Sequence, residues 1–253
     1  MGKLNGKVAI ITGGGKGIGF GVAKAFAKEG ANLVLTGRTE SRLVSAKERL
    51  EADYGVRVLP MVADGADEAA IKGVVEAAVE TFGSITTLVN NAQVSKSGVM
   101  LADHRKEDFD LAIYSGLYAT FFYMRACYPY LKATRGSVIN FASGAGLFGK
   151  PGQASYAAAK EGIRGMSRVA ATEWGPDGIN VNVICPLAMT ESLEQWKAAY
   201  PDVYAKTIGG IPLGRFADPE MDLGPVCVFL ASDDAAYVTG ETITLQGGSG
   251  LRP

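Results

Sequence analysis

Short apolar runs rich in β-branched residues alternate with longer amphipathic stretches along almost the whole chain. The runs are VAIIT (8–12), NLVLT (32–36), VRVLPMV (56–62), ITTLV (85–89), SVINFA (137–142), INVNVI (179–184) and TITLQ (242–246). Their near-continuous hydrophobicity is typical of strands covered on both faces. The stretches between them, such as 19–30, 68–83 and 155–175, have helical character and end at glycines, where helices commonly stop.

This alternation predicts a parallel sheet with right-handed crossovers and helices on both faces. Such an arrangement is a doubly wound α/β fold of the Rossmann type. The chain has 253 residues, of which 47% are hydrophobic, so one large core can form without disulfides or metals. We therefore expect a single domain over residues 1–253.

Charge and cysteine content exclude several classes of protein. The net charge is −1, which argues against the broad basic surface that binds nucleic acid or an anionic membrane. The apolar runs are also far shorter than the roughly 20 residues of a membrane span. Cys127, Cys185 and Cys227 lie far apart in apolar runs, which suggests reduced core thiols and a cytoplasmic protein. There is no Cys/His cluster that predicts a metal site.

The first predicted strand runs directly into a glycine-rich loop, TGGGKGIG at 12–19. Gly13, Gly17 and Gly19 would let the backbone approach a pyrophosphate closely. A helix beginning at Ile18 would then offer its free N–H groups and the positive end of its dipole to the anion. The loop predicts a dinucleotide site, because it lies between a strand and a helix.

The end of the second predicted strand indicates which dinucleotide is bound. An acidic residue there would bind the hydroxyls of an adenosine ribose and repel a phosphate. Here the chain has Gly37 followed by Arg38, and Lys16 lies in the glycine loop. Two cations suit a 2′-phosphate, so we expect NADP(H) as the cofactor.

Polar or small motifs follow the other predicted strands. They are Asp64 after the third strand, NNAQ (90–93) after the fourth, Ser143 after the fifth, and CPLAMT (185–190) after the sixth. Ligands bind at the carboxyl ends of the strands in open parallel sheets, so we expect cofactor contacts from Asp64, Asn90, Pro186 and Thr190. Asp64 would accept a hydrogen bond from adenine or, alternatively, cap the helix that follows.

Tyr156 and Lys160 are four residues apart in a predicted helix, in SYAAAKEG, and therefore share one face. A free phenol has a pKa of about 10, so its use as a base near neutral pH requires about 4 kcal/mol of stabilisation. A nearby lysine cation and an oxidised nicotinamide would both favour the phenolate. Ser143 precedes Tyr156 closely and would hold a substrate oxygen beside the phenol. These residues, Ser143, Tyr156 and Lys160, are the predicted catalytic group.

Together, TGGGKGIG, NNAQ, Ser143, YAAAK and GETITLQGG resemble the short-chain dehydrogenases/reductases over essentially the whole chain. The resemblance implies a seven-stranded sheet, a homotetramer or homodimer packed through helices near 107–131 and 155–174, and reversible carbonyl/alcohol interconversion of a small molecule. It implies that Tyr156 is the general acid/base. Lys160 would lower the tyrosine pKa and, with Tyr156, contact the cofactor at its nicotinamide ribose. Ser143 would orient the carbonyl.

Three positions depart from that family pattern. Gly116 stands where a fourth catalytic residue, an asparagine, is expected. We expect the glycine to provide a helix kink and an exposed carbonyl. Gln93 replaces the glycine of the usual NNAG and would place an amide near cofactor or substrate. In PLAMT, Thr190 comes one residue early, which puts its contact with the nicotinamide carboxamide in question.

A long excursion at about 187–218 interrupts the alternation and carries Trp196, Tyr200 and Tyr204 at four-residue spacing. Excursions of this length are often substrate lids; an ordinary surface helix pair is the alternative. We expect the substrate pocket to be lined by Gln93, Gln153, Ser155, Met189, Trp196 and Tyr200. His104, the only histidine, lies in a polar loop, where we expect it to be solvated.

The NNAQ and SGLYATF segments are more similar to bacterial hydroxysteroid dehydrogenases than to acyl-carrier-protein reductases. The sequence therefore predicts an NADP(H)-dependent alcohol dehydrogenase or ketoreductase acting on a secondary alcohol such as a hydroxysteroid. A 3-oxoacyl thioester reductase is one alternative. A protein that binds NADP(H) as a sensor without turnover is another, and an epimerase or dehydratase with the same site is a third.

Overall fold

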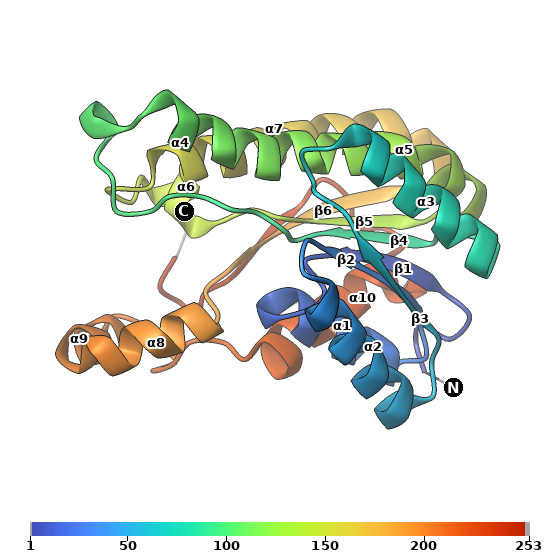
Figure 1. Ribbon diagram of the computed structural model, residues 1–253, viewed down its shortest axis with the longest axis horizontal. Helices are drawn as coiled ribbons and strands as arrows, with labels where there is room; N and C mark the ends of the chain where they lie inside the picture. The colour runs from blue at the N-terminus through green and yellow to red at the C-terminus, as the bar shows by residue number, and fades with distance from the viewer. Residues whose placement is uncertain (1, 251–253) are drawn as a thin grey trace.

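Seven parallel strands form one sheet in the computed structural model, which describes residues 2–250 (Figure 1). The sheet order is β3-β2-β1-β4-β5-β6-β7. The strands are β1 (Val8–Thr12), β2 (Asn32–Gly37), β3 (Val58–Val62), β4 (Thr87–Asn90), β5 (Ser137–Phe141), β6 (Asn180–Pro186) and β7 (Thr242–Leu245). Each overlaps one of the predicted runs, so the predicted doubly wound α/β fold is confirmed.

Helices cover both faces of this sheet. α1, α2 and α10 lie on one face, and α3, α4, α5 and α7 lie on the other (Figure 1). The helices are α1 (Gly17–Lys28), α2 (Glu40–Tyr54), α3 (Glu68–Phe82), α4 (Lys106–Ala112), α5 (Ala119–Thr134), α6 (Gly144–Phe148), α7 (Ala154–Trp174), α8 (Glu191–Ala199), α9 (Pro201–Gly209) and α10 (Gly224–Ala231). Short turns are 3-10 helical at η1 (Leu101–Asp103), η3 (Gly175–Asp177) and η5 (Asp233–Ala235), and π-helical at η2 (Ile113–Tyr118) and η4 (Pro219–Leu223).

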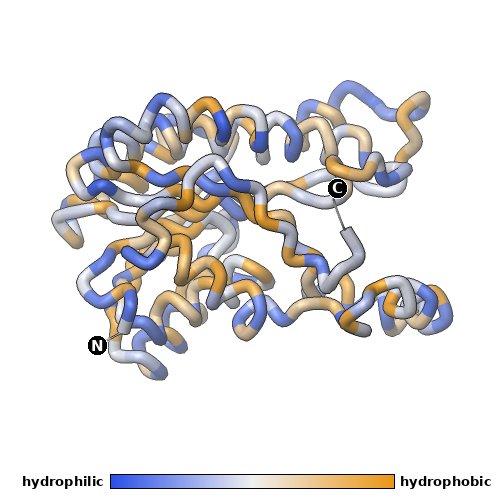
Figure 2. Tube along the Cα trace, turned by 180° about the vertical axis from the view of Figure 1, so that it is seen from behind, coloured by the Kyte–Doolittle hydropathy of each residue, from blue (hydrophilic) through white to orange (hydrophobic). Residues whose placement is uncertain are grey.

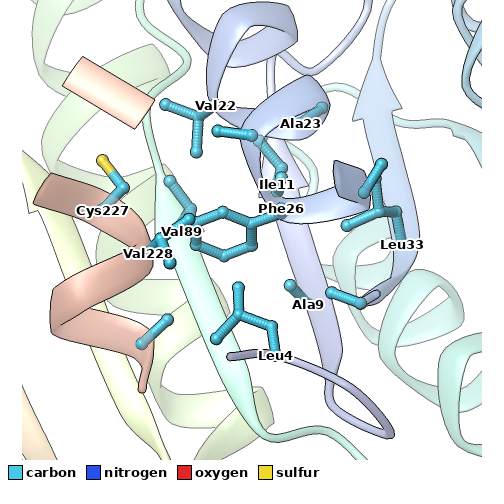
Figure 3. Close-up of a cluster of buried hydrophobic side chains, with 14 of the residues drawn as sticks. Leu4, Ala9, Ile11, Val22, Ala23, Phe26, Leu33, Val89, Cys227 and Val228 are labelled. Carbon is cyan, nitrogen blue, oxygen red and sulfur yellow. The ribbon is translucent and has the colours of Figure 1, made fainter. Parts of the chain in front are cut away.

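The apolar core is divided by the sheet into two large clusters. Figure 2 shows apolar residues gathered along the strands and the helix faces that cover them. On the α1 side, Phe26 is fully buried and packs among Ile11, Leu33, Val89 and Val228 (Figure 3). The opposite cluster holds the strand residues that point the other way, including Ile10, Val34, Leu88 and Val138. Alternate residues of the same strands thus serve both faces.

Helix α3 shows how local sequence sets an element's limits. Asp67 is its N-cap and accepts hydrogen bonds from the N–H groups of Ala69 and Ala70, at 2.9 and 3.1 Å. Gly83 ends the helix in the left-handed region, with φ of 80°. The alternative in which Asp64 caps this helix is therefore wrong, because Asp64 accepts from the N–H of Ala66 in the preceding turn.

The excursion at 187–218 forms the helix pair α8 and α9, which projects from the layered body (Figure 1). Its two ends are tied together, since Ala217 N donates to Leu187 O and Met189 N donates to Ala217 O. Trp196 and Tyr204 contact each other edge to face, with ring centroids 6.1 Å apart. A pair of helices on this base is consistent with a lid, and that role stays a prediction.

The burial of the cysteines and the apolar character of the helices can be compared with the sequence-based predictions. Cys127, Cys185 and Cys227 are buried and form no disulfide, which confirms the prediction of core thiols. Burial raises the pKa of Cys127 and Cys227. Across residues 2–250, no helix is both long enough and apolar enough to cross a bilayer.

We predict that Phe26→Ala lowers the free energy of unfolding by about 3–5 kcal/mol, because it leaves a cavity among fully buried neighbours. Urea unfolding followed by circular dichroism measures this change. Tyr237→Ala is the control, since Tyr237 is fully exposed, and it should change the free energy by less than about 0.5 kcal/mol. Equal effects from both substitutions would contradict this description of the core.

Candidate active site

A cleft of about 440 Å³ opens at the carboxyl ends of β1–β4. The sheet order reverses between β1 and β4, and such a reversal leaves a crevice in which ligands bind. The cleft brings together residues that are far apart in the sequence. Of the predicted site residues, those lining it are Gly13, Lys16, Gly17, Ile18, Arg38, Asp64, Asn90, Gln93 and Thr190.

The glycine loop has the backbone shape that an anion site requires. Gly13 and Gly17 have φ values of 68° and 54°, in the left-handed region that favours glycine. A Cβ atom on Gly19 would collide with the carbonyl oxygen of Gly13. Helix α1 starts at Gly17, and no side chain caps its first turn. Its free N–H groups therefore face the cleft.

Positive charge gathers where the second strand ends. Lys16 and Arg38 both line the cleft and are exposed. Arg42, in the first turn of α2, joins them and was missed from the sequence. Its position four residues after Arg38 was the signal that could have revealed it. Among residues 2–250, none of the three forms an ion pair with a carboxylate.

A buried chain of hydrogen bonds leads from the cleft to helix α7. Asn90 Nδ2 donates to Asn140 Oδ1 at 2.9 Å, and Asn140 Nδ2 donates to Ser167 Oγ at 2.8 Å. The other amide atom of Asn90, Oδ1, is buried and has no hydrogen-bond partner within residues 2–250. Sequence reasoning missed Asn140 and Ser167, although a polar residue inside the apolar run SVINFA was a visible signal.

Tyr156 and Lys160 lie one turn apart on the same face of α7, with Lys160 Nζ 5.6 Å from the centre of the Tyr156 ring. Lys160 is only 3% exposed, and its Nζ donates to Phe141 O at the end of β5 at 2.6 Å. Ser143, the N-cap of α6, accepts from Ala145 N at 3.1 Å and is also a hydrogen-bond partner of Tyr156. The three predicted catalytic residues therefore meet at the end of β5.

Burial shifts two pKa values in this group. Burial raises the pKa of Tyr156, and the hydrogen bond from Ser143 only partly opposes that rise. Burial also lowers the pKa of Lys160 to about 8. In the protein without cofactor, removal from water outweighs the other influences on the phenol, so a lowering of the tyrosine pKa by Lys160 and an oxidised nicotinamide together stays a prediction.

The remaining predicted residues are distributed around this centre. Pro186 ends β6. Gln153 is held at the start of α7, where its Oε1 accepts from Ser97 Oγ at 3.2 Å. Met189 is held by its backbone at the base of the excursion, and Trp196 packs on Tyr204 within the helix pair. Gln153, Met189 and Trp196 do not line the cleft, so their contact with substrate stays a prediction.

The expectation for His104 is wrong. Its ring is half-buried, and Nε2 lies 2.8 Å from the hydroxyl of Ser155, which is fully buried. The Ser155 hydroxyl therefore contacts His104, and its contact with substrate stays a prediction. Tyr200, which we also placed in the pocket, is 58% exposed. The loop holding His104 folds onto the start of α7, where Gly98 N donates to Gly152 O.

Gly116 lies in the π-helical turn η2 between α4 and α5, so the predicted helix irregularity is present. Its carbonyl is not exposed as we expected. Gly116 is buried and its oxygen accepts from the N–H of Ala119.

Within residues 2–250, no cluster of His, Cys, Asp and Glu side chains is arranged to hold a metal ion.

Three comparisons place this chain among known proteins. The profile of the enoyl-(acyl carrier protein) reductase family matches residues 13–249. A 12alpha-hydroxysteroid dehydrogenase from a Clostridium species is 63% identical over 259 residues, which cover 100% of both chains. The 3-oxoacyl-(acyl-carrier-protein) reductase FabG of Thermotoga maritima is 38% identical over 97% of this chain and 98% of its own.

A solved structure of NAD+-bound xylitol dehydrogenase covers 97% of this chain and 100% of its own, with a TM-score of 0.91 and 28% identity. The match in sequence thus extends over the same residues as the match in fold. The chain belongs to the short-chain dehydrogenases/reductases, close to the hydroxysteroid dehydrogenases, and is an oxidoreductase that interconverts a secondary alcohol and a ketone with a nicotinamide cofactor.

Proposed function

We propose that this protein is an NADP(H)-dependent hydroxysteroid dehydrogenase that acts on the 12α-hydroxyl of a steroid and on the corresponding ketone. The observation that carries the proposal is the 63% identity with a 12alpha-hydroxysteroid dehydrogenase over the full length of both chains. The matched length includes the cleft, the catalytic group and the helix pair. The arrangement of Ser143, Tyr156 and Lys160 at the end of β5 supports the chemistry.

The cleft fits a dinucleotide on structural grounds. The left-handed glycines, the uncapped start of α1 and the unpartnered Asn90 Oδ1 are suited to phosphate and ribose groups. The residues that would hold the cofactor are Gly13, Lys16, Gly17, Ile18, Gly19, Arg38, Asp64, Asn90, Tyr156, Lys160, Pro186 and Thr190. When bound, its nicotinamide ring supplies or accepts the hydride at the substrate carbon.

Cofactor choice follows from the charges around the end of β2. Lys16, Arg38 and Arg42 line one part of the cleft, and each lacks a carboxylate partner among the described residues. Three unpaired cations in one place repel each other, and a doubly charged phosphate relieves that repulsion. We therefore propose NADP(H) over NAD(H).

Tyr156 would exchange the proton with the substrate oxygen. Its raised pKa keeps the phenol protonated near neutral pH, so it can donate to a carbonyl oxygen during reduction. In the oxidative direction the phenol must lose its proton. Lys160 stays positively charged below a pH of about 8 and favours the phenolate. Ser143 would hold the same substrate oxygen in place by a hydrogen bond.

The helix pair at 187–218 would close over the substrate as a lid. Its aromatic residues, including Trp196, suit a large, flat and apolar molecule such as a steroid. Gln93, Gln153 and Met189 would add contacts of mixed polarity. This lid would exclude water from the reacting atoms.

We also propose that the protein is a homodimer or homotetramer and that it is cytoplasmic. Large apolar side chains are exposed along α4, η2, α5 and α7, at Leu111, Tyr114, Tyr118, Phe121 and Val169. Tyr114 and Tyr118 stack on each other, with ring centroids 5.0 Å apart. An exposed apolar row of this kind is typical of a surface that packs against another subunit.

A reductase of 3-oxoacyl thioesters is the second candidate, supported by the 38% identity with FabG of Thermotoga maritima. The much higher identity with the steroid enzyme favours the first candidate. An NADP(H) sensor without turnover has no support among these relatives, since each is named as an enzyme.

The proposed function predicts NADP+-dependent oxidation of a 12α-hydroxysteroid, measured by the absorbance of the reduced nicotinamide. Tyr156→Phe should lower kcat at least about a hundredfold, because the proton donor is lost. Its Kd for NADP+ should rise by no more than about tenfold, the loss of one hydrogen bond to the cofactor. Tyr237→Phe, at a fully exposed position, is the control. Faster turnover of a 3-oxoacyl thioester than of any hydroxysteroid would favour the second candidate.

Phosphate recognition by Lys16 and Arg38 predicts that the double variant Lys16→Ala/Arg38→Ala binds NADPH about a hundredfold more weakly, since two charge-assisted hydrogen bonds are lost. NADH affinity should change by no more than about twofold, because NADH lacks the phosphate. Fluorescence titration measures both Kd values. Lys28→Ala, at an exposed position in the last turn of α1, is the control. Equal losses for NADPH and NADH would rule out phosphate recognition.

The buried lysine predicts a pH-dependent stability. Its pKa is about 8 in the folded protein and 10.5 in the unfolded chain. Between these values the unfolded chain binds the proton that the folded protein has lost, so stability rises with pH. Relative to Lys160→Met, the wild type should gain up to about 3 kcal/mol between about pH 7 and pH 10. Urea unfolding at both pH values measures this gain, and a constant difference would show that burial leaves Lys160 unaffected.

A further inference from the structure

Gln93 and Gly116 face each other across the wall of the cleft. Gln93 comes from the loop after β4, and Gly116 lies in the turn η2. A Cβ atom at position 116 would lie 2.6 Å from Cδ, 2.8 Å from Oε1 and 3.0 Å from Nε2 of Gln93. The amide of Gln93 therefore occupies the space that a side chain at 116 would need. A residue larger than glycine cannot fit there while Gln93 holds this position.

Hydrogen bonds between the residues next to Gln93 and Gly116 join the loop after β4 to the turn η2. Val94 N donates to Ser115 Oγ at 3.1 Å, and Ser115 Oγ lies 2.8 Å from Val94 O. The loop and the turn therefore cannot separate without losing these contacts. The two segments are therefore fixed next to each other, and the amide of Gln93 lies between them.

The amide of Gln93 is buried although its own hydrogen bonds are poor. Nε2 reaches Ala112 O only at 3.5 Å, and Oε1 is buried with no hydrogen-bond partner in residues 2–250. Burying such a group costs about 1–3 kcal/mol when it finds no partner. An apolar side chain would fill the same space without that cost, so simple packing does not account for an amide here.

The turn η2 also contacts the helix that carries the catalytic pair. A Cβ atom on Gly162, two residues after Lys160, would lie 2.8 Å from Cδ2 of Leu117. The turn and α7 are therefore in close contact beside Lys160. A shift of the turn would move the part of α7 on which the placement of Lys160 depends.

We propose that Gln93 is a positioning residue for the oxidoreductase reaction, and that its amide supplies from the β4 loop the polar group missing from the side chain of Gly116. The amide supports the π-helical turn beside α7. Its Oε1 is enclosed beside η2 without a partner among residues 2–250, where it would accept a hydrogen bond from a buried water molecule. The two residue types can then be exchanged between the two positions. A protein with glycine at position 93 and an amide side chain at position 116 should be as active as the wild type.

A double-mutant cycle tests this proposal. The proteins are the wild type, Gln93→Gly, Gly116→Asn, and Gln93→Gly/Gly116→Asn. Gly116→Asn alone should lower kcat/KM at least about tenfold because its side chain meets Gln93, and Gln93→Gly alone should do the same because the amide is lost. The double variant should recover to within about threefold of the wild type. Gly73→Asn in α3 controls for a helical glycine exchange, since a Cβ atom there meets no other atom within 4 Å.

The pH profile of kcat/KM separates positioning from a loss of folding. In Gln93→Gly its midpoint should move away from the wild-type value, and it should return in the double variant, while thermal unfolding shows that all four proteins are folded. Gln93→Met keeps the volume and removes the amide, so it should behave like Gln93→Gly. Wild-type activity in Gln93→Met, or a double variant as poor as Gly116→Asn, would overturn the proposal.

This inference rests on the proposed function only for its assay. Turnover of a hydroxysteroid by the wild type is measured first, and its absence would count against the proposed function alone. The Kd for NADP+ of the same four proteins then decides the present inference. This Kd should be higher in both single variants than in the wild type, and it should return toward the wild-type value in the double variant. Purely additive changes in the binding free energy would overturn the proposal.

Discussion

The reversal of strand order between β1 and β4 is the constraint on which the site depends. All seven strands are parallel, so their carboxyl ends lie at one edge of the sheet. The chain runs outward from β1 to β3 and then returns to place β4 on the other side of β1. The connections diverge at that point and leave the cleft open. Residues from distant parts of the sequence meet there because every strand ends at the same edge of the sheet.

The backbone at the first strand end then decides what the cleft can hold. Gly13 and Gly17 adopt left-handed conformations, and Gly19 comes close to Gly13. These glycines bring N–H groups forward in place of side chains. They suit an anion, and in the proposed function the cations around the end of β2 would bind a second phosphate. Charge is concentrated locally, in a chain whose net charge is only −1.

The proposed catalytic group lies in a region that is unfavourable for its own charges. Lys160 is buried with one backbone carbonyl as its hydrogen-bond partner among the described residues, and Tyr156 is held in its neutral form by burial. Natural proteins retain such groups where function needs them, at a cost in stability. The supporting contacts are correspondingly extensive, from the amides of Asn90 and Asn140 to the contact between Gln93 and Gly116.

The sequence by itself determined the seven strands, the glycine loop and the spacing of Tyr156 and Lys160, because these are local patterns with periods that a strand or helix imposes. It did not reveal that Asp67 caps α3, that His104 contacts Ser155, or that Gln93 fills the space beside Gly116. The last two contacts join segments that are distant in the chain and are brought together only by packing. The pKa of Tyr156 was decided in the same way, since its direction depends on how much water the folded protein excludes.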